Sequence, residues 1–324
     1  MVILCAGSWV ADFVAAHLPN IPDPGGLVYA PGGISLRVGG HSANVAVDLS
    51  QLGELFIHSI GCIGGDILGN YIEETLRLNG IAPHPQRIQE KETAKNLALI
   101  VDREDRRFIS ELAANTELSS SHVESIIEKV QPTIFYLGTV GGLKYVDFEL
   151  KHVLKAARDN GATIIVDVIM PTNGWRHLTS AYPYIDILHC NGLEATSITG
   201  FTDSRKAAKQ LTAAGVGVSV VTLGSHGLFA HNGADLLEMP AFSVTEVDST
   251  GAGDALCAGI ISALSRSGSK FPSMEQIRDI LLFASAAGAA CVTSIGATTS
   301  VTKANVEKLI LEQGESMTQK IKIY

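Results

Sequence analysis

The stretch Gly251-Ala252-Gly253-Asp254 places a carboxylate where a flexible turn runs into an apolar helical pattern. A helix N-terminus presents unpaired N–H groups and the positive end of a dipole, and glycine lets the backbone approach an anion closely. Residues 251–253 therefore predict an anion hole that suits a phosphoryl group. Asp254 would repel a resting phosphate, so we interpret it as a general base that accepts a proton from a substrate hydroxyl. The alternative is that Asp254 only caps the helix.

The composition excludes several classes of protein. The chain has 324 residues, 46% of them hydrophobic, which is enough for a large core. A net charge of −9 without basic runs argues against binding to nucleic acid or to an anionic membrane surface. No apolar run reaches the length of a membrane span and the first residues lack a signal peptide's basic region, so we expect a cytoplasmic protein. The five cysteines form no C-x-x-C pair, which indicates buried free thiols.

Short apolar runs alternate with helical patterns along the chain. This alternation predicts an α/β fold, in which helices cover both faces of a central, mostly parallel sheet. The expected core strands are 2–6, 56–60, 134–137, 163–168, 185–189 and 218–222. The expected helices are 43–52, 66–79, 147–160, 205–214, 253–265, 274–292 and 303–312. Two segments, 25–38 and 93–111, alternate apolar and polar residues, which predicts antiparallel strands of a small flap over the edge of the sheet.

Four motifs together resemble the ribokinase (PfkB) family of carbohydrate kinases. DSTGAGD at 248–254 is similar to the family signature D-T-x-G-A-G-D, with one Thr-to-Ser change at Ser249. GGHSANVA at 39–46 matches G-G-x-x-x-N-x-A, NGLE at 191–194 matches N-x-x-E, and TLGSHG at 222–227 resembles the nucleotide-binding turn. They occur in the family's order and span essentially the whole chain. The resemblance implies a ribokinase-like three-layer α/β/α domain over 1–324, with lid strands inserted at about 13–38 and 84–113.

The resemblance also implies an activity: ATP- and Mg²⁺-dependent phosphorylation of a hydroxyl on a sugar or sugar-like molecule. Asp254 would be the general base, and the amides of Gly251, Ala252 and Gly253 would form the anion hole. The positions implied for the substrate are Asp12, Gly39, Gly40, His41, Asn44 and Val10. Those implied for the cofactor are Asn191 and Glu194, which would organise Mg²⁺ through water, and Thr222, Gly224 and Gly227, which would line the ATP site. Each position has an ordinary structural alternative, such as a turn, a helix cap or a solvated acid.

Some family members hold a monovalent cation, usually K⁺, beside the anion hole. The matching positions here are Asp248, Thr250, Cys291, Ser294, Gly296 and Ser300, several of them acting through backbone carbonyls. The alternative is a plain loop between two helices. Lids in this family often pair between subunits, so the resemblance also implies a homodimer.

The chain departs from ribokinase in the sugar pocket, which argues against ribose as the substrate. Val10 stands where ribokinase has Asn, His41 where it has Lys, and 137–139 where it has a sugar-binding Glu. Trp9 beside Val10 would make that side of the pocket apolar and suit a base or a ring face, unless Trp9 is packed in the core. Asp167 and Trp175 loosely fit a motif of sugar-acid and fructose kinases, which keeps a hexose or a sugar acid open.

Other readings of the residues stay open. A nucleoside kinase of the same fold is one alternative, and a non-catalytic sugar sensor is another, although a sensor needs no base at Asp254. Lys95 could point into the pocket from the flap, or it could be exposed. Arg106-Arg107 is interpreted as a solvated hairpin tip.

Overall fold

The computed structural model describes residues 1–102, 104, 106–171, 174–267 and 273–324. In this part of the chain the larger sheet has ten strands, in the order β14-β13-β12-β11-β10-β9-β8-β1-β4-β5. Their bounds are β1 Ile3–Ala6, β4 Ile57–Gly64, β5 Ala82–Ile88, β8 Ile134–Val140, β9 Thr163–Val168, β10 Ile187–Asn191, β11 Val218–Thr222, β12 Leu228–His231, β13 Leu236–Met239 and β14 Lys322–Ile323. The strands from β5 to β11 pair in parallel, and β12, β13 and β14 add an antiparallel edge.

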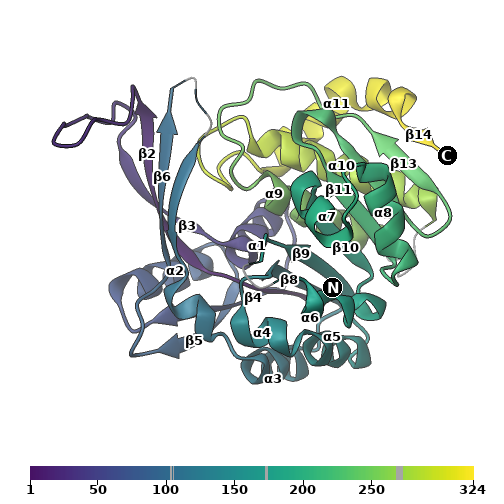
Figure 1. Cartoon of the computed structure of the whole chain (residues 1–324), viewed down its shortest axis with the longest axis horizontal. Coiled ribbons are helices and arrows are strands. Elements are labelled where there is room, and N and C mark those ends of the chain that lie inside the picture. The colour runs from purple at the N-terminus through teal and green to yellow at the C-terminus, as the bar shows by residue number, and fades with distance from the viewer. Residues whose placement is uncertain (103, 105, 172–173, 268–272) are drawn as a thin grey trace.

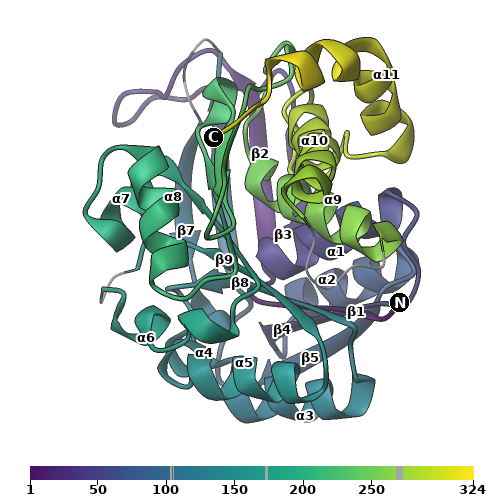
Figure 2. The same cartoon turned by 90° about the vertical axis from the view of Figure 1, so that its right-hand side faces the viewer.

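Helices cover both faces of this sheet, and the alternation of side chains along the strands explains why. Ile3 and Cys5 of β1 contribute to one core cluster, and Leu4 and Ala6 contribute to the other. The first face carries α1 His41–Gln51, α2 Ile67–Leu78, α9 Ala252–Ser267, α10 Met274–Cys291 and α11 Lys303–Lys320. The second carries α3 Ser120–Val130, α4 Lys144–Phe148, α5 Leu150–Asp159, α6 Arg176–Thr179, α7 Gly192–Thr199 and α8 Ser204–Ala213. Figure 2 shows the two helical layers on opposite sides of the strands, which confirms the predicted three-layer α/β/α class.

A second, smaller sheet stands against one side of the large one, and we call it the lid (Figure 1). Its order is β3-β2-β6-β7, with bounds β2 Val10–Leu18, β3 Ile34–Gly39, β6 Lys95–Val101 and β7 Arg107–Glu111. The flap was expected from 25–38 and 93–111, but its longest strand is β2, and β2 pairs in parallel with β6. The chain turns out of the large sheet at Gly7, whose φ is +153°. The apolar residues on either side of this turn therefore form two strands, β1 in the large sheet and β2 in the lid.

The segment bounds expected for the lid, 13–38 and 84–113, differ from these strands in two places. β2 begins at Val10, and β5, which includes residues 84–88, hydrogen-bonds to β4 in the large sheet. The single helix expected over 147–160 is also two helices, α4 and α5, which meet at Glu149, whose ψ of 19° interrupts the helix. Among the described residues, no helix combines the length and apolarity that a bilayer crossing requires.

Candidate active site

Asp254 lies in the first turn of α9, directly after a turn of small residues. Gly251 has φ +82°, a left-handed conformation that favours glycine. A Cβ on Gly251 would lie 2.5 Å from the Cβ of Ala297, so the turn also needs a residue without a side chain. Within the described chain, the N–H groups of Gly251 and Gly253 have no hydrogen-bond partner, and the N–H of Ala252 makes a long 3.4 Å contact with the carbonyl of Ser249. The turn therefore presents free donors at the positive end of α9, as an anion hole requires.

The carboxylate of Asp254 is buried and is held on one side. The side-chain amide of Asn44 donates to Oδ2 at 2.8 Å, whereas Oδ1 has no hydrogen-bond partner among the described residues. Nε2 of His41 lies 4.0 Å from Oδ1. Burial raises the pKa of Asp254, and the nearby His41 partly offsets this effect. One oxygen is thus fixed and the other is free to accept a proton, which is the arrangement of a general base.

The double glycine brings the lid strand β2 close to α1. A Cβ on Gly39 would lie 1.9 Å from Oδ2 of Asp12, and a Cβ on Gly40 would lie 2.4 Å from the carbonyl oxygen of Ser8. Asp12 is 8% exposed, and its Oδ1 accepts from the amide of Asn96 at 2.8 Å. Burial raises its pKa to about 6. These contacts place the Asp12 carboxylate beside the two glycines, at the junction of the lid and the large sheet.

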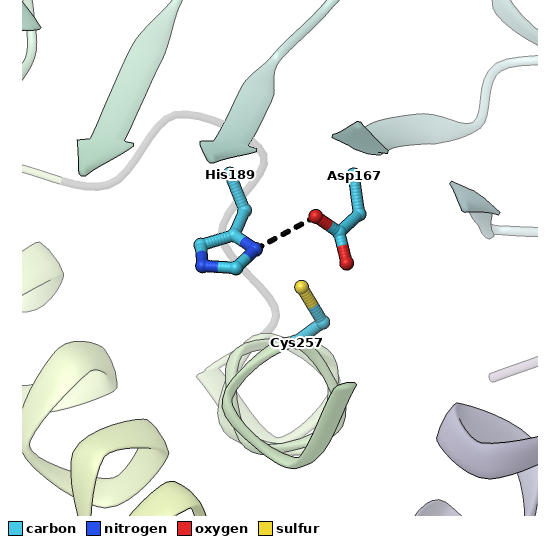
Figure 3. A group of neighbouring side chains, drawn as sticks. All are labelled: Asp167, His189 and Cys257. Carbon is cyan, nitrogen blue, oxygen red and sulfur yellow. Dashed lines mark hydrogen bonds and ion pairs between the residues drawn. The ribbon is translucent and has the colours of Figure 1, made fainter. Parts of the chain in front are cut away.

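A buried polar cluster joins Asp167, which the sequence motif named, to His189 and Cys257, which sequence reasoning did not single out (Figure 3). Nδ1 of His189 lies 2.8 Å from Oδ1 of Asp167, and its Nε2 lies 3.1 Å from the hydroxyl of Thr222. Burial by itself would raise the pKa of Asp167, but the adjacent His189 outweighs it, so the pKa is lowered. A Cβ on Gly253 would lie 3.1 Å from Cε1 of His189. The imidazole therefore backs the anion hole directly, and Cys257 of α9 completes the cluster.

The N-x-x-E motif forms the start of α7. The side chain of Asn191 accepts from the N–H groups of Leu193 and Glu194, and Glu194 accepts from the N–H of Asn191 at 2.8 Å. This reciprocal capping box confirms that both residues have a structural role as well. Burial raises the pKa of Glu194, which lines a cavity of about 890 Å³ together with Asp254 and the anion hole. A single carboxylate that faces a wide cavity fits a Mg²⁺ ion that keeps most of its water ligands.

The nucleotide-binding turn lines a narrower cavity that lies next to the wide one. Thr222, Gly224 and Gly227 all contribute to this cavity of about 210 Å³, and Phe242 and Leu256 make part of its wall apolar. The two cavities share Thr222, Gly224, Ala252 and Gly253 in their walls, so the apolar slot adjoins the cavity that Asp254 lines. An apolar slot next to unpartnered backbone amides has the character expected of a nucleotide site.

The six positions expected for a monovalent cation lie together beside the anion hole. The carboxylate of Asp248 accepts from the N–H and the hydroxyl of Thr250 at 3.0 and 2.6 Å, and from the N–H of Gly296 at 3.0 Å. The sulfur of Cys291 lies 3.2 Å from the carbonyl oxygen of Thr250 and 3.0 Å from that of Ala297, and its one S–H can donate to either of them. Ser294 and Ser300 hydrogen-bond to each other at 2.6 Å. The loop therefore brings a carboxylate and two backbone carbonyls near one another, and oxygen ligands of these kinds are ones that K⁺ accepts.

The contacts of Arg106 and Lys95 test two expectations for the lid. Arg106 was interpreted as solvated, but it donates to the hydroxyl of Ser249 and lines the wide cavity, so that interpretation is wrong. Lys95 forms ion pairs with Glu92 and Glu111 on the partly exposed lid.

Trp9 does not form the apolar pocket wall that was one of its two expected roles. Trp9 is fully buried in the core, and its Nε1 donates to Ser59 at 3.0 Å, so it offers no face to a substrate. Val10 is buried as well, and it pairs with Gly39 across the lid. Both side chains are therefore part of the packed interior.

Comparison with known proteins decides the family. A family model described as pfkB family carbohydrate kinase matches residues 2–304. The chain belongs to the pfkB family of carbohydrate kinases. Within the curated members of the pfkB family, it is 26% identical over 313 residues to the probable fructokinase-7 of Arabidopsis thaliana, covering 91% of this chain and 88% of the relative. It is 25% identical over 302 residues to the ribokinase of Haemophilus influenzae, covering 91% and 93%.

Solved structures of pfkB-type kinases share the fold. The ribokinase of Thermotoga maritima superimposes with a TM-score of 0.78 at 25% identity, covering 96% of this chain and 99% of that one. The fructokinase of Xylella fastidiosa, solved with bound ATP, gives a TM-score of 0.79 at 23% identity, covering 97% and 99%. The ribokinase-like fold and the class of carbohydrate kinase, both predicted from the motifs, are thereby confirmed.

Proposed function

We propose that this carbohydrate kinase transfers the γ-phosphoryl group of ATP to a hydroxyl of a sugar, with Asp254 as the general base. The observation that carries the proposal is the state of the Asp254 carboxylate. Its Oδ1 is buried and unpartnered among the described residues, and it lies in the same turn as the free amides of Gly251 and Gly253. A base and an anion hole in one turn suit a reaction that removes a hydroxyl proton while charge spreads over a phosphoryl group.

In this proposal, one group of residues binds the sugar and another binds the nucleotide and Mg²⁺. Asp12, Asn44 and His41 face the sugar side, where carboxylate, amide and imidazole groups pair with hydroxyls. Thr222, Gly224 and Gly227 line the slot proposed for the nucleotide. Glu194 and Asn191 would hold Mg²⁺ through water, and the bound ion would neutralise charge on the phosphates. Asp254 takes the proton, and the amides of 251–253 hold the oxygens of the phosphoryl group in transfer.

The substrate class follows from the relatives and from the pocket wall. Fructokinases and a ribokinase are the relatives named above, and the buried Trp9 removes the clamp on which a nucleoside kinase was suggested. We therefore favour a free monosaccharide. A non-catalytic sugar sensor is disfavoured, because a sensor needs neither a buried base nor free amides.

Two further proposals belong to the same account. The oxygens around Asp248 would bind K⁺, and the bound ion would steady the anion-hole turn through Thr250. The lid exposes apolar side chains, with Ile34 72% and Ile109 63% exposed, and a second copy of the chain would cover them in a homodimer. Light scattering of the intact protein tests the dimer, and replacement of Ile109 by Lys should shift it to the monomer.

The experiment for the activity is ADP release from Mg-ATP with a panel of ketohexoses, aldopentoses, sugar acids, polyols and nucleosides, in the presence of K⁺. Turnover of a monosaccharide would support the proposal. A preference for a nucleoside would replace the substrate class. Saturable binding of a sugar without any turnover across the panel would overturn the kinase and favour the sensor.

A further inference from the structure

Thr139, near the end of β8, has a backbone conformation that a β-branched residue rarely adopts. Its φ is +63°, and it is 2% exposed. The register between β8 and β9 shifts between Leu137 and Val140, so Gly138 and Thr139 form a bulge in an otherwise regular buried strand. Bulges next to active sites often redirect a side chain, and a strained residue persists only where its surroundings hold it. The strained backbone of Thr139 therefore directs attention to the contacts of its side chain.

The side chain of Thr139 is the centre of a small hydrogen-bonded cluster that also contains Ser8 and His41. Its hydroxyl lies 2.9 Å from Nδ1 of His41 and 2.7 Å from the hydroxyl of Ser8, and it accepts from the N–H of Ser8 at 3.3 Å. The hydroxyl of Ser8 in turn accepts from the N–H of His41 at 3.3 Å. Three segments that are distant in sequence, after β1, at the start of α1 and in β8, thus meet at one imidazole.

Gly138 makes room for this imidazole. A Cβ on Gly138 would lie 2.6 Å from the Cβ of His41 and 2.6 Å from the phenol oxygen of Tyr136. Both residues of the bulge therefore contact His41: Gly138 leaves space for its side chain, and the hydroxyl of Thr139 hydrogen-bonds to its Nδ1.

We infer a proton arrangement for this cluster in which a neutral His41 carries its hydrogen on Nε2. The Thr139 oxygen accepts the N–H of Ser8, and in this arrangement it also accepts the hydroxyl proton of Ser8, because the other described partner of that hydroxyl, the N–H of His41, is a donor. Its own proton then goes to Nδ1 of His41, which leaves the hydrogen of the neutral ring on Nε2. Nε2 is the nitrogen that lies 4.0 Å from Oδ1 of Asp254.

The gap between these two atoms fits one oxygen. An oxygen about 2.8 Å from each, an ordinary hydrogen-bond length, spans a separation of this size. A substrate hydroxyl there would donate its proton to Oδ1 of Asp254, accept from Nε2 of His41 and keep a lone pair for the phosphorus. Oδ1 is buried and has no hydrogen-bond partner in the described chain, so it is left as the acceptor for this proton.

We propose that Thr139 is a positioning residue that locks the ring of His41, through Nδ1, so that Nε2–H faces the reacting hydroxyl beside Asp254. The proposal rests on the proposed sugar kinase activity. It extends that activity by assigning a role to the bulge in β8 and to Ser8. Asp254 remains the base, and His41 orients the hydroxyl that Asp254 deprotonates.

The test compares two substitutions of similar size. Thr139→Ser keeps the hydroxyl, and Thr139→Val keeps the branched shape without it. We expect Thr139→Ser to stay within about threefold of wild-type kcat and Thr139→Val to lose roughly tenfold or more, with an unchanged KM for ATP, because one orienting hydrogen bond of about 1–1.5 kcal/mol is lost. Equal activity of the two variants, whether high or low, would overturn the proposal.

Two further measurements guard against a merely structural effect. In a double-mutant cycle, Thr139→Val should cause little additional loss in a His41→Ala background, whereas additive losses would show that Thr139 does not act through His41. Long-range ¹H–¹⁵N spectra at alkaline pH should place the His41 proton on Nε2 in wild type and show a changed tautomer distribution in Thr139→Val and in Ser8→Ala. An unchanged His41 signal in both variants would contradict the proposal, and because this readout needs no turnover, it separates that failure from a failure of the kinase activity.

Discussion

The turn before α9 makes a quantitative prediction for Gly251→Ala. Alanine at φ +82° costs ~1–2 kcal/mol, because the left-handed region crowds its Cβ against the backbone. Its Cβ would also lie 2.5, 2.7 and 2.8 Å from Cβ, Cα and O of Ala297. Overpacking of this kind costs a further ~1–3 kcal/mol, and two of the three neighbours are backbone atoms, which cannot move aside as the end of a flexible side chain can. The free energy of unfolding should fall by roughly 2–5 kcal/mol in total.

Gly200 supplies the matched control. It has φ +77°, and a Cβ there would meet nothing within 4 Å, so Gly200→Ala carries the conformational cost alone. At about 2 °C per kcal/mol, Tm measured by calorimetry should fall by roughly 4–10 °C for Gly251→Ala and by roughly 2–4 °C for Gly200→Ala. In the ADP-release assay, Gly251→Ala should lose ~10²–10³ in kcat, as expected when an anion-hole donor moves, whereas Gly200→Ala should keep wild-type kcat. If the two variants match in both Tm and kcat, the close packing of Gly251 against Ala297 does not shape the site.

Three further predictions follow from the site's contacts. Arg106→Ala should lower kcat/KM roughly tenfold, because the guanidinium of Arg106 donates to Ser249 beside the anion-hole turn. Arg107→Ala is the control: Arg107 pairs only with Glu104 in the contacts described, on the exposed side of the hairpin, so kcat/KM should change by less than about twofold. Equal losses of kcat/KM in the two variants would contradict the role given to Arg106. Because burial raises the pKa of Asp12 to about 6, its carboxylate is lost as the pH falls through about 6, so KM for the sugar should rise below that pH and Asp12→Asn should abolish this dependence. Replacing Na⁺ by K⁺ should raise kcat in wild type but not in Asp248→Ala; the same response in both would remove the cation site from the account.

Local sequence signals predicted the parts of the site in which one short segment does the work. The glycines before Asp254, the double glycine before α1 and the Asn191–Glu194 cap each place their functional groups through the backbone of a single turn. The apolar core strands were also predicted, because strands buried on both faces read as continuous apolar runs.

The contacts that sequence reasoning missed join distant segments. Arg106 reaches Ser249 across 143 positions of sequence, and His189 pairs with Asp167 on the neighbouring strand. No local pattern distinguishes such residues from solvated or core residues, and their role appears only once the strand order is known. Thr139 is a sharper case, because its unusual backbone conformation follows from the bulge and leaves no trace in composition or periodicity.

The same limit explains Trp9 and β2. An aromatic residue after the first strand is compatible with a pocket wall or with the core, and the amino-acid type alone does not choose between them. Its fully buried position depends on Gly61, where a Cβ would lie 2.3 Å from the indole ring. The extent of β2 likewise depends on pairing with β6, which lies more than eighty residues further along the chain.

The most direct test of the central claim is the single-turnover rate of phosphoryl transfer in Asp254→Asn, with the monosaccharide that the panel identifies. Asparagine keeps the shape of the side chain but cannot take the proton, so the rate should fall by ~10²–10⁴ while the sugar and ATP still bind. Asn44→Ala is the companion variant, because it removes the 2.8 Å hydrogen bond that holds Oδ2 but leaves the base in place, and its loss should be smaller. A rate for Asp254→Asn within about tenfold of wild type would contradict the assignment of Asp254 as the general base.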